Sequence, residues 1–404
     1  MTERIIFHID VNNAFLSWSA VKLLKEGYKI DIRTIPSIIG GDEKARHGIV
    51  LAKSPVAKKY GIKTAETLFQ AKQKCAQLQI YSPDYNWYYQ KSSELFTYLS
   101  QYTPLIEQYS IDECFLDMTG TNYLYKNHIE LANKIKNEIN QKFGYTVNIG
   151  IGNNKLCAKM ASDFEKPNKI HTLYKNEIQH KLWNLDVGEL FMCGKKTAEE
   201  LKKLNIYTIE DLARVNDKIL ERKFKNQAIY LKKAAWGIDD SEVVARSSKR
   251  DSISTTETLP YDYNDSQKLK EILLRQTEKI SRELRKQNQY TKTVTVIFRN
   301  SDFQNYTSQT KLKIPTNKTD DIYKSVLEIF NDSWKKDSIR LIGVRLSDFT
   351  DNQEHQMTLF DNSTNKDIKE DKIQKIIDDI NNKFGNNSVI PATLKKIVNV
   401  DKNQ

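Results

Sequence analysis

The stretch LIEQYSIDECFLDMT, residues 105–119, decides the fold class of this chain. Its two ends are apolar and strand-like, whereas its centre carries Asp112 and Glu113, which predicts two strand halves joined at a polar break. The apolar strand IIFHID (residues 5–10) precedes it, and an amphipathic helix and the strand YTVNIGIG (residues 145–152) follow it. A further helix is expected between IIFHID and LIEQYSIDECFLDMT. The resulting order strand–helix–strand–strand–helix–strand predicts a ferredoxin-like sheet.

The rest of the chain predicts further domains, as expected for 404 residues. The predicted boundaries are a first domain at 1–21 and 81–180, an insertion at 22–80, short helices at 181–238, a polar linker at 239–250, a second sheet with helices at 251–350, and a polar tail at 351–404. The fold class is therefore α+β with several domains.

Composition and charge narrow the range of partners and protein classes that fit this chain. The chain carries 63 Lys and Arg against 52 Asp and Glu, a net charge of +11, and residues 246–350 alone hold 20 basic and 14 acidic side chains. A folded basic surface favours nucleic acid as partner, although a merely basic protein remains an alternative. No apolar run is long enough to cross a bilayer, and the start of the chain does not resemble a signal peptide. Four scattered cysteines without a CxxC pair favour a reducing cytoplasm over a disulfide framework or a zinc finger.

Three carboxylates are the strongest candidates for chemistry. Asp10 ends the first strand, and Asp112 and Glu113 occupy the polar break, so a ferredoxin-like sheet can bring all three to one end. Crowded carboxylates repel each other unless a cation is present, and Mg²⁺ prefers a few carboxylates together with substrate phosphates. Two such ions would suit a phosphoryl displacement. The alternative is that Asp112 and Glu113 form an ordinary turn.

Lysines near the same end could bind a triphosphate. Lys159 lies on the helix predicted after YTVNIGIG, and Lys58 and Lys59 lie on a short helix after GIVLAK. The motif GGDE at residues 40–43 resembles that of diguanylate cyclases, but it lies in the insertion rather than in the central hairpin. We therefore interpret it as a turn between two strands.

Four blocks together resemble the Y family of translesion DNA polymerases, of the bacterial DNA polymerase IV and UmuC-like kind. They are HIDVNNAFLSWSA, GIVLAKSPVAKKYGIK, YSIDECFLD and NIGIGNNKLCAKMASDFEKPN, in the family's order and at its intervals. The resemblance covers roughly residues 4–400 and implies a low-fidelity, template-directed DNA polymerase. It also implies a ferredoxin-like palm, inserted fingers, a helix-hairpin-helix thumb and an α+β little finger.

The resemblance implies a role for individual residues. Asp10, Asp112 and Glu113 correspond to the ligands of two Mg²⁺ ions, with the backbone carbonyl of Val11 completing one shell. Phe15 corresponds to an aromatic steric gate that excludes a 2′-hydroxyl, with an ordinary core helix residue as the alternative. Lys159 corresponds to a lysine on the triphosphate of the dNTP, and Lys58 replaces the family's arginine, keeping the charge but losing the bidentate fork.

Two segments depart from the family pattern. Pro55 stands where the family commonly has a tyrosine that donates to the triphosphate, and Asn12, Asn13 and Ala14 replace larger or acidic residues. These departures favour the UmuC-like branch over a standard DNA polymerase IV. Met192 replaces the first glycine of the expected helix-hairpin-helix turn, which leaves the geometry of that turn open.

The resemblance also implies contacts to partners, namely primer–template DNA, dNTP and the replicative sliding clamp, with a monomer expected. The candidate DNA contacts are Gly194, Lys195, Lys196 and Thr197 in the thumb and Lys292, Arg299, Lys311 and Lys313 in the little finger. Gln356, Leu359 and Phe360 resemble the family's clamp-binding peptide. The second hypothesis is a DNA- and clamp-binding accessory protein with a degenerate site, which the intact carboxylates and Phe15 disfavour.

Overall fold

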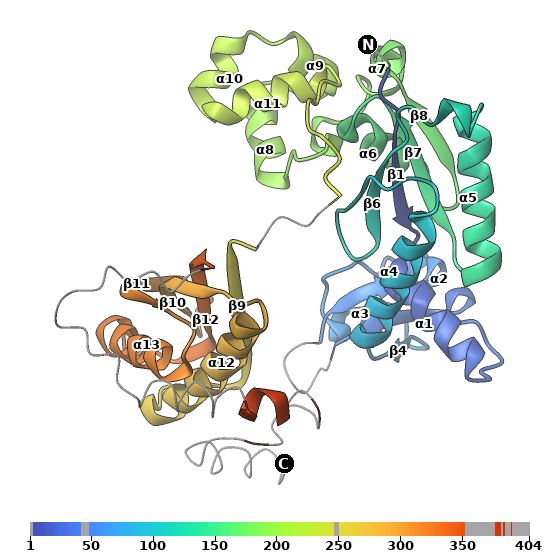
Figure 1. The fold of residues 1–404 in the computed structure, drawn as a ribbon. Coiled ribbons are helices and arrows are strands. Elements are labelled where there is room, and N and C mark those ends of the chain that lie inside the picture. Colours follow the sequence, from blue (N-terminus) through green and yellow to red (C-terminus); the bar gives the residue numbers. More distant parts are fainter. Residues whose placement is uncertain are drawn as a thin grey trace. The chain divides into compact units, whose positions relative to one another are not determined.

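The computed structural model describes residues 3–41, 48–245, 250–351, 376–380, 383 and 389. The chain forms two compact units. The first unit contains the residues before 249, with the exception of 43–47, and the second contains the residues from 249 onward. Each unit has its own hydrophobic core (Figure 1).

The first unit is built on a five-stranded sheet with the strand order β5-β6-β1-β7-β8. Its strands are β1 (Ile6–Val11), β5 (Ile106–Gln108), β6 (Glu113–Asp117), β7 (Val147–Gly152) and β8 (Ile170–Leu173). The first four have the predicted ferredoxin-like order, and β8 adds a fifth strand parallel to β7. The break between β5 and β6 lies at Asp112, as the polar centre of LIEQYSIDECFLDMT predicts.

Side chains of β1 alternate between the two faces of this sheet. Phe7, Ile9 and Val11 join the core under α4 (Tyr85–Leu99) and α5 (His128–Phe143). His8 and Asp10 therefore face the other side, where α6 (Lys155–Asp163) packs against β1 and β7 (Figure 1). The candidate carboxylates thus lie on the face that α6 covers.

The segment between β1 and α4 forms a smaller layer with its own three-stranded sheet, in the order β3-β2-β4. Its elements are α1 (Ala14–Lys25), η1 (Ile32–Thr34), β2 (Ser37–Gly40), β3 (Val50–Lys53), α2 (Pro55–Lys59), α3 (Leu68–Lys74) and β4 (Gln79–Tyr81). Residues 42–47, which contain part of the GGDE motif, lie outside the described residues.

A helical segment follows β8 and buries a further core, which includes Leu201, Leu212 and Leu231. Its elements are η3 (Lys175–Glu177), α7 (Ile178–Lys181), η4 (Val187–Glu189), α8 (Lys195–Lys203), α9 (Ile209–Arg214), α10 (Asp217–Phe224) and α11 (Asn226–Ala235). Thr208 caps α9, because its side chain accepts a hydrogen bond from the backbone N–H of Asp211.

The first residues of the expected linker at 239–250 pack against the first unit. Val243 is buried against Ile6 and Phe115 of the central sheet. The backbone N–H of Val244 donates to the carboxylate of Glu107 at 2.9 Å. The residues up to Val244 therefore pack on the first unit.

The second unit is a four-stranded antiparallel sheet in the order β11-β10-β12-β9, covered on one face by two helices (Figure 1). Its elements are β9 (Ser252–Tyr263), α12 (Ser266–Lys286), β10 (Tyr290–Asn300), β11 (Asn305–Thr316), α13 (Thr319–Ser333) and β12 (Ile339–Thr350). Within the predicted tail, residues 376–380 are helical, and Asp378 forms ion pairs with Arg282 and Arg285 of α12.

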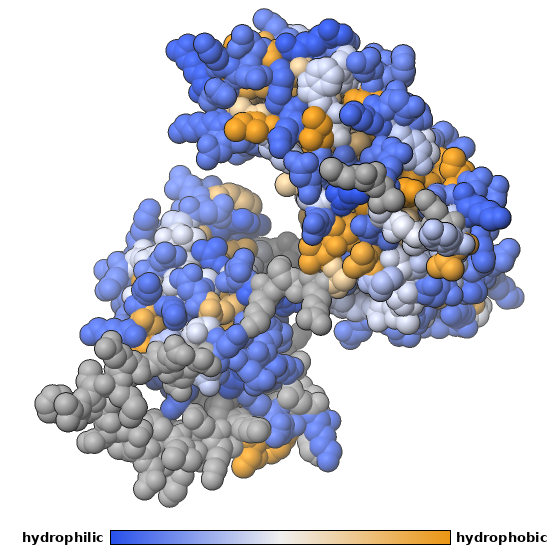
Figure 2. Space-filling view, turned by 45° about the horizontal axis from the view of Figure 1, so that its top comes forward, coloured by the Kyte–Doolittle hydropathy of each residue, from blue (hydrophilic) through white to orange (hydrophobic). Residues whose placement is uncertain are grey.

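The surface drawn in Figure 2 is mostly hydrophilic, and its hydrophobic residues gather in a few small groups. Among the residues that the structure describes, no helix combines the length and hydropathy needed to span a membrane.

Candidate active site

The strand register places two of the candidate carboxylates face to face. Asp10 on β1 is the direct cross-strand partner of Glu113 on β6. The backbone N–H of Val11 donates to the carbonyl oxygen of Asp112 at 3.0 Å, which fixes the polar break beside the end of β1. Like charges in this position repel each other, so the arrangement calls for cations.

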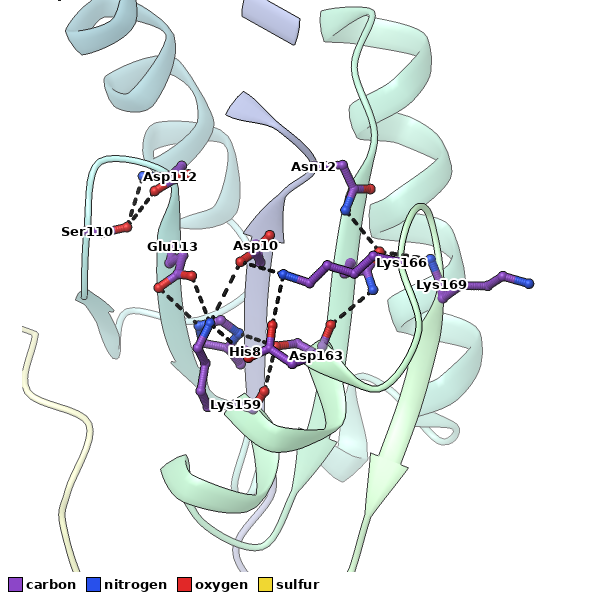
Figure 3. Close-up of polar contacts among 12 residues, drawn as sticks. His8, Asp10, Asn12, Ser110, Asp112, Glu113, Lys159, Asp163, Lys166 and Lys169 are labelled. Atoms are coloured by element: carbon purple, nitrogen blue, oxygen red, sulfur yellow. Dashed lines mark hydrogen bonds and ion pairs between the residues drawn. The ribbon is translucent and has the colours of Figure 1, made fainter. Parts of the chain in front are cut away.

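Helix α6 carries the first cation, Lys159, to these carboxylates (Figure 3). Its Nζ lies 2.8 Å from Glu113 Oε1, 3.3 Å from Asp163 Oδ2 and 3.7 Å from Asp10 Oδ2, and the residue is 8% exposed. The helix comes this close because Gly150 of β7 has no side chain. A Cβ there would lie 2.0 Å from the carbonyl oxygen of Ala158.

Lys166 supplies a second ammonium to the same cluster (Figure 3). Its Nζ lies 3.0 Å from Asp10 Oδ2 and 2.8 Å from Asp163 Oδ1. Sequence reasoning assigned no role to this residue. The signal available was its place in the block CAKMASDFEKPN, seven residues after Lys159, where the chain leaves α6 and can return toward the sheet.

Burial and charge shift the protonation of this cluster. Burial, and then the hydrogen bond and charge of Glu113, raise the pKa of Asp10 to about 7, although Lys166 and Lys159 oppose this rise. Burial also raises the pKa of Asp112, whose carboxylate accepts a hydrogen bond from Ser110 Oγ at 2.6 Å. Burial alone would lower the pKa of Lys159, but Glu113, Asp163 and Asp10 raise it overall. The cluster therefore keeps its lysines charged.

The donor set fits a hard divalent cation, because it consists of carboxylates whose ionisation burial opposes and a cation would restore. In the described part of the chain, however, no three Asp, Glu, His or Cys side chains converge on one point. The contacts explain this. Asp112 turns to Ser110, while Asp10 and Glu113 turn to the ammonium groups of Lys159 and Lys166.

Phe15 lies in the first turn of α1, directly after the end of β1. It is half-buried, and its ring stacks on Tyr88 of α4 with a centroid distance of 4.7 Å and an interplanar angle of 9°. The edge of Tyr85 contacts the same ring. Phe15 is thus held by ring contacts but remains partly accessible.

The loop between β1 and α1 explains two departures from the family pattern. Asn12 is buried, and its side chain donates to Asn148 Oδ1 at 3.0 Å and accepts from Thr146 Oγ1 at 2.9 Å. Asn13 adopts a left-handed backbone with φ of 50°, and its side chain donates to the carbonyl of Lys53 at 2.6 Å. Asparagine suits both positions, because it bonds locally and tolerates positive φ.

Pro55 and Lys58 lie on the short helix α2. Ser54 caps this helix by accepting from the backbone N–H of Ala57 at 2.9 Å, and Pro55 takes the first position, where a missing N–H costs nothing. Lys58 is exposed in the last turn. The structure brings Asp10, Glu113 and Lys159 into contact and places Asp112 at the adjoining break, but it gives Lys58 no contact with them.

The candidate thumb contacts lie at the start of α8. Gly194 is the residue before the helix, and Lys195, Lys196 and Thr197 form its first turn. No side chain caps this end, and no atom beyond the neighbouring residues lies within 4 Å of the position that a Cβ on Gly194 would take. Met192, in place of the expected glycine, adopts a positive φ of 67°.

In the second unit, Val294, Val296 and Phe298 of β10 face the core under the helices. Arg299 therefore lies on the open face of the sheet, as do Lys311, paired with Thr293, and Lys313 two residues further along β11. Lys292 lies at an irregularity in the strand pairing between Thr291 and Thr293, so it does not share this regular row. Gln356, Leu359 and Phe360 lie outside the described residues.

Comparisons with known proteins show the family of the chain. The model of the impB/mucB/samB family matches residues 9–163, and that of its C-terminal domain matches residues 250–359. The chain is 44% identical over 392 residues to DNA polymerase IV of Clostridium acetobutylicum, covering 97% of this chain and 98% of that protein. It is 34% identical to DNA polymerase IV 1 of Bacillus subtilis, covering 98% and 94%.

Solved structures support the fold. A Y-family polymerase chimera, Dbh-Dpo4(243-245)-Dbh, is 28% identical, with a TM-score of 0.73 over 86% of this chain and 100% of that one. DinB from Sulfolobus solfataricus is 27% identical, with a TM-score of 0.57 over 85% and 98%. The predicted fold class is confirmed, whereas the preference for the UmuC-like branch is not, since the similar curated proteins are named DNA polymerase IV. The chain therefore belongs to the Y family of DNA polymerases, in its DNA polymerase IV group, and is a DNA-directed translesion polymerase.

Proposed function

We propose that this polymerase extends the primer at the cluster formed by Asp10, Asp112 and Glu113, and that these carboxylates hold two Mg²⁺ ions. The observation that carries this assignment is the strand register, which sets Asp10 opposite Glu113 with Asp112 at the adjoining break. The chemistry that two bound Mg²⁺ ions supply is activation of an attacking oxygen and stabilisation of a leaving group. The carbonyl of Val11, next to Asp10, would complete one shell.

The lysines of the cluster would bind the triphosphate of the incoming dNTP. Lys159 and Lys166 already hold two ammonium groups beside Asp10, so phosphate oxygens entering the site would meet positive charge. Of the two, Lys166 is the more accessible, with a side chain 36% exposed against 10% for Lys159. We therefore add Lys166 to the proposed triphosphate ligands Lys159 and Lys58. Of these three lysines, Lys58 would be the outermost.

DNA would bind away from the chemistry, through contacts that do not depend on sequence. The uncapped N-terminus of α8 offers backbone N–H groups to a phosphate. The open face of the second sheet offers Arg299, Lys311 and Lys313 to the backbone of the duplex. The segment around Gln356, Leu359 and Phe360 would bind the sliding clamp. Four buried free cysteines support a reducing compartment such as the cytoplasm.

Primer extension with purified variants tests the assignment. Asp112→Ala and Glu113→Ala should abolish Mg²⁺- and dNTP-dependent extension, while primer–template affinity stays close to that of the unchanged protein. Glu165→Ala is the matched control, because Glu165 carries the same charge near the site but is exposed and pairs with Lys169. Near-normal extension by either active-site variant would contradict the assignment of these carboxylates.

A further inference from the structure

Two buried asparagines lie beside the carboxylate cluster and contact the segment that carries Lys166. Asn148 on β7 is the direct cross-strand partner of Asp10, and Asn12 directly follows β1. Asn148 is fully buried, and Asn12 is 8% exposed. The amide of Asn12 donates to Asn148 Oδ1 at 3.0 Å, so the two side chains form one unit, the asparagine pair.

Asn148 contacts the backbone of the lysine segment, residues 162–169, from both ends of its amide. Its Nδ2 donates to the carbonyl oxygens of Ser162 at 3.0 Å and Glu165 at 2.6 Å. Its Oδ1 accepts from the backbone N–H of Lys169 at 3.2 Å. Together with the bond inside the pair, these contacts use both hydrogens and both lone pairs of the amide. Truncating this side chain would therefore leave buried backbone groups unpaired.

Asn12 holds the same segment at a neighbouring position. Its Oδ1 accepts from the backbone N–H of Asn168 and from Thr146 Oγ1, each at 2.9 Å. Backbone N–H groups only donate and backbone carbonyls only accept, so the orientation of both amides follows from their partners. Lys136 adds a contact from outside, since its Nζ donates to the carbonyl oxygen of Asn168 at 3.1 Å. The pair thus contacts the segment on both sides of Lys166.

The position of Lys166 depends on this backbone. Its side chain reaches back from the segment, so that Nζ lies 3.0 Å from Asp10 Oδ2 (Figure 3), and the side chain is 36% exposed. A long side chain loses rotamer entropy when it keeps such a position, and it would lose the contact if its backbone also moved. The asparagine pair removes that second freedom.

We propose that Asn12 and Asn148 are positioning residues that fix the lysine segment and thereby hold Lys166 in place for the triphosphate of the incoming dNTP. The inference rests on the proposed function of Lys166 as a triphosphate ligand. When the pair is broken, the segment is in its binding position for only a fraction of the time, and the apparent affinity for dNTP falls by that fraction. A bound triphosphate returns Lys166 to its place, so the loss falls on KM and not on kcat.

Asn12→Ala and Asn148→Ala test the inference by primer extension at varied dNTP concentration. Each should raise KM for dNTP about five- to tenfold, the effect of losing one or two hydrogen bonds, with kcat close to that of the unchanged protein. Asn153→Ala is the matched control, because this amide after β7 also bonds distant backbone groups, at Arg4 and Lys175, and should leave KM unchanged. If Asn148→Ala does not fold, Asn12→Ala decides. An unchanged KM, or a fall in kcat alone, would overturn the inference.

Combining Asn12→Ala with Lys166→Ala shows whether the pair acts through Lys166. The double variant should have the KM of Lys166→Ala, because no ammonium is left to position. A further rise in KM would overturn the inference. An unchanged KM in Lys166→Ala itself would contradict the proposed function of Lys166, whereas a raised KM there with an unchanged one in Asn12→Ala would overturn the positioning role alone.

Amide hydrogen exchange tests the pair in the absence of dNTP. The backbone N–H of Asn168 should be protected in the unchanged protein and should exchange at least about fivefold faster in Asn12→Ala, because that variant removes its acceptor. Asn153→Ala should leave this exchange rate as it is. Equal exchange of the Asn168 amide in Asn12→Ala and in the unchanged protein would show that the pair does not hold the segment, and the inference would be wrong.

Discussion

At the scale of single residues, the site is a balance between three carboxylates, of which Asp10 is buried and Asp112 and Glu113 are half-buried, and two lysines. Asp10 is 7% exposed, and its pKa of about 7 shows that burial and Glu113 together outweigh the lysines. Removing a lysine from such a cluster leaves negative charge uncompensated, and removing a carboxylate leaves positive charge uncompensated. Variants that keep the charge but change the geometry are therefore the most informative ones.

Phe15 offers a test that does not change any charge. Phe15→Ala should admit ribonucleotides if the ring, which stacks on Tyr88, is the steric gate that the family resemblance implies. We expect the preference for dNTP over rNTP, measured as the ratio of kcat/KM values, to fall at least about tenfold. Phe96→Ala is the control, since Phe96 of α4 packs against the same core. Unchanged discrimination would leave Phe15 as a core residue.

Lys166 can be tested by removing its charge in one variant and keeping that charge on a differently shaped side chain in another. Lys166→Ala should lower kcat/KM for dNTP by about ten- to a hundredfold, because one charged contact to the triphosphate is lost. Lys166→Arg should restore part of this, since the charge remains. Lys169→Ala, which removes an exposed lysine of the same segment, is the matched control. A loss confined to thermal stability would show that Lys166 serves only its ion pairs with Asp10 and Asp163.

At the scale of elements, the structure shows which parts local sequence can predict. The strands around Asp112 and the helix ending at Gly144 follow from alternation, periodicity and a helix stop, which are local signals. The pairing of Asp10 with Glu113 and the return of Lys166 to Asp10 depend on register and on packing between distant segments. Such contacts leave no local periodic trace. The ferredoxin-like strand order predicted only that the carboxylates meet at one end of the sheet, and nothing in the sequence predicted the contact of Lys166 with Asp10.

Gly150 shows how one residue sets the position of α6. In Gly150→Ala the new Cβ would meet two backbone atoms of that helix, the carbonyl oxygen of Ala158 at 2.0 Å and the nitrogen of Ser162 at 2.4 Å. The helix would have to move and take Lys159 with it. We expect a loss of about 2–4 kcal/mol in the free energy of unfolding and a clear fall in kcat. Gly194→Ala, where space is open, should leave unfolding in urea nearly unchanged.

Helix α12 carries a titratable group that links the stability of the second unit to pH. Burial raises the pKa of Glu278 to about 7, against the opposing charges of Arg282 and Arg285, which pair with Asp378. Between pH 4.5 and 7 the folded state keeps a proton that the unfolded state has lost, so stability from this group falls as pH rises.

Glu278→Gln should remove that dependence. The variant should be more stable than the unchanged protein at pH 7 and should differ from it less at pH 5, as measured by urea unfolding of the second unit. Glu328→Gln, at an exposed position of α13, should change neither value. Equal stability of the Glu278 variant and the unchanged protein at both pH values would show that Glu278 is ionised in the folded state.

At the scale of the whole molecule, the charges proposed for chemistry and those proposed for DNA binding belong to different units of the chain. The lysines of the first site are paired with carboxylates, whereas Lys311 and Lys313 lie exposed on the open face of the second sheet. Exposed charges release counterions when they bind phosphate, so DNA affinity should depend on salt through the second group. A partner that binds away from Lys311 and Lys313 should leave the salt dependence of DNA affinity unchanged.

The proposed clamp-binding segment allows this separation to be tested on the full chain. The neighbours of Leu359 and Phe360 in DNQEHQMTLFDNSTNKD are mainly polar, and burying two such side chains in a partner pocket would contribute roughly 1.5–3 kcal/mol each. Replacing both by alanine should leave DNA affinity, its salt dependence and synthesis without the clamp intact, and should remove stimulation by the sliding clamp. Lys366→Ala, a change in the same tail, is the control and should keep the stimulation. If the double variant instead melts several degrees lower, Leu359 and Phe360 anchor the tail internally and the clamp assignment is wrong.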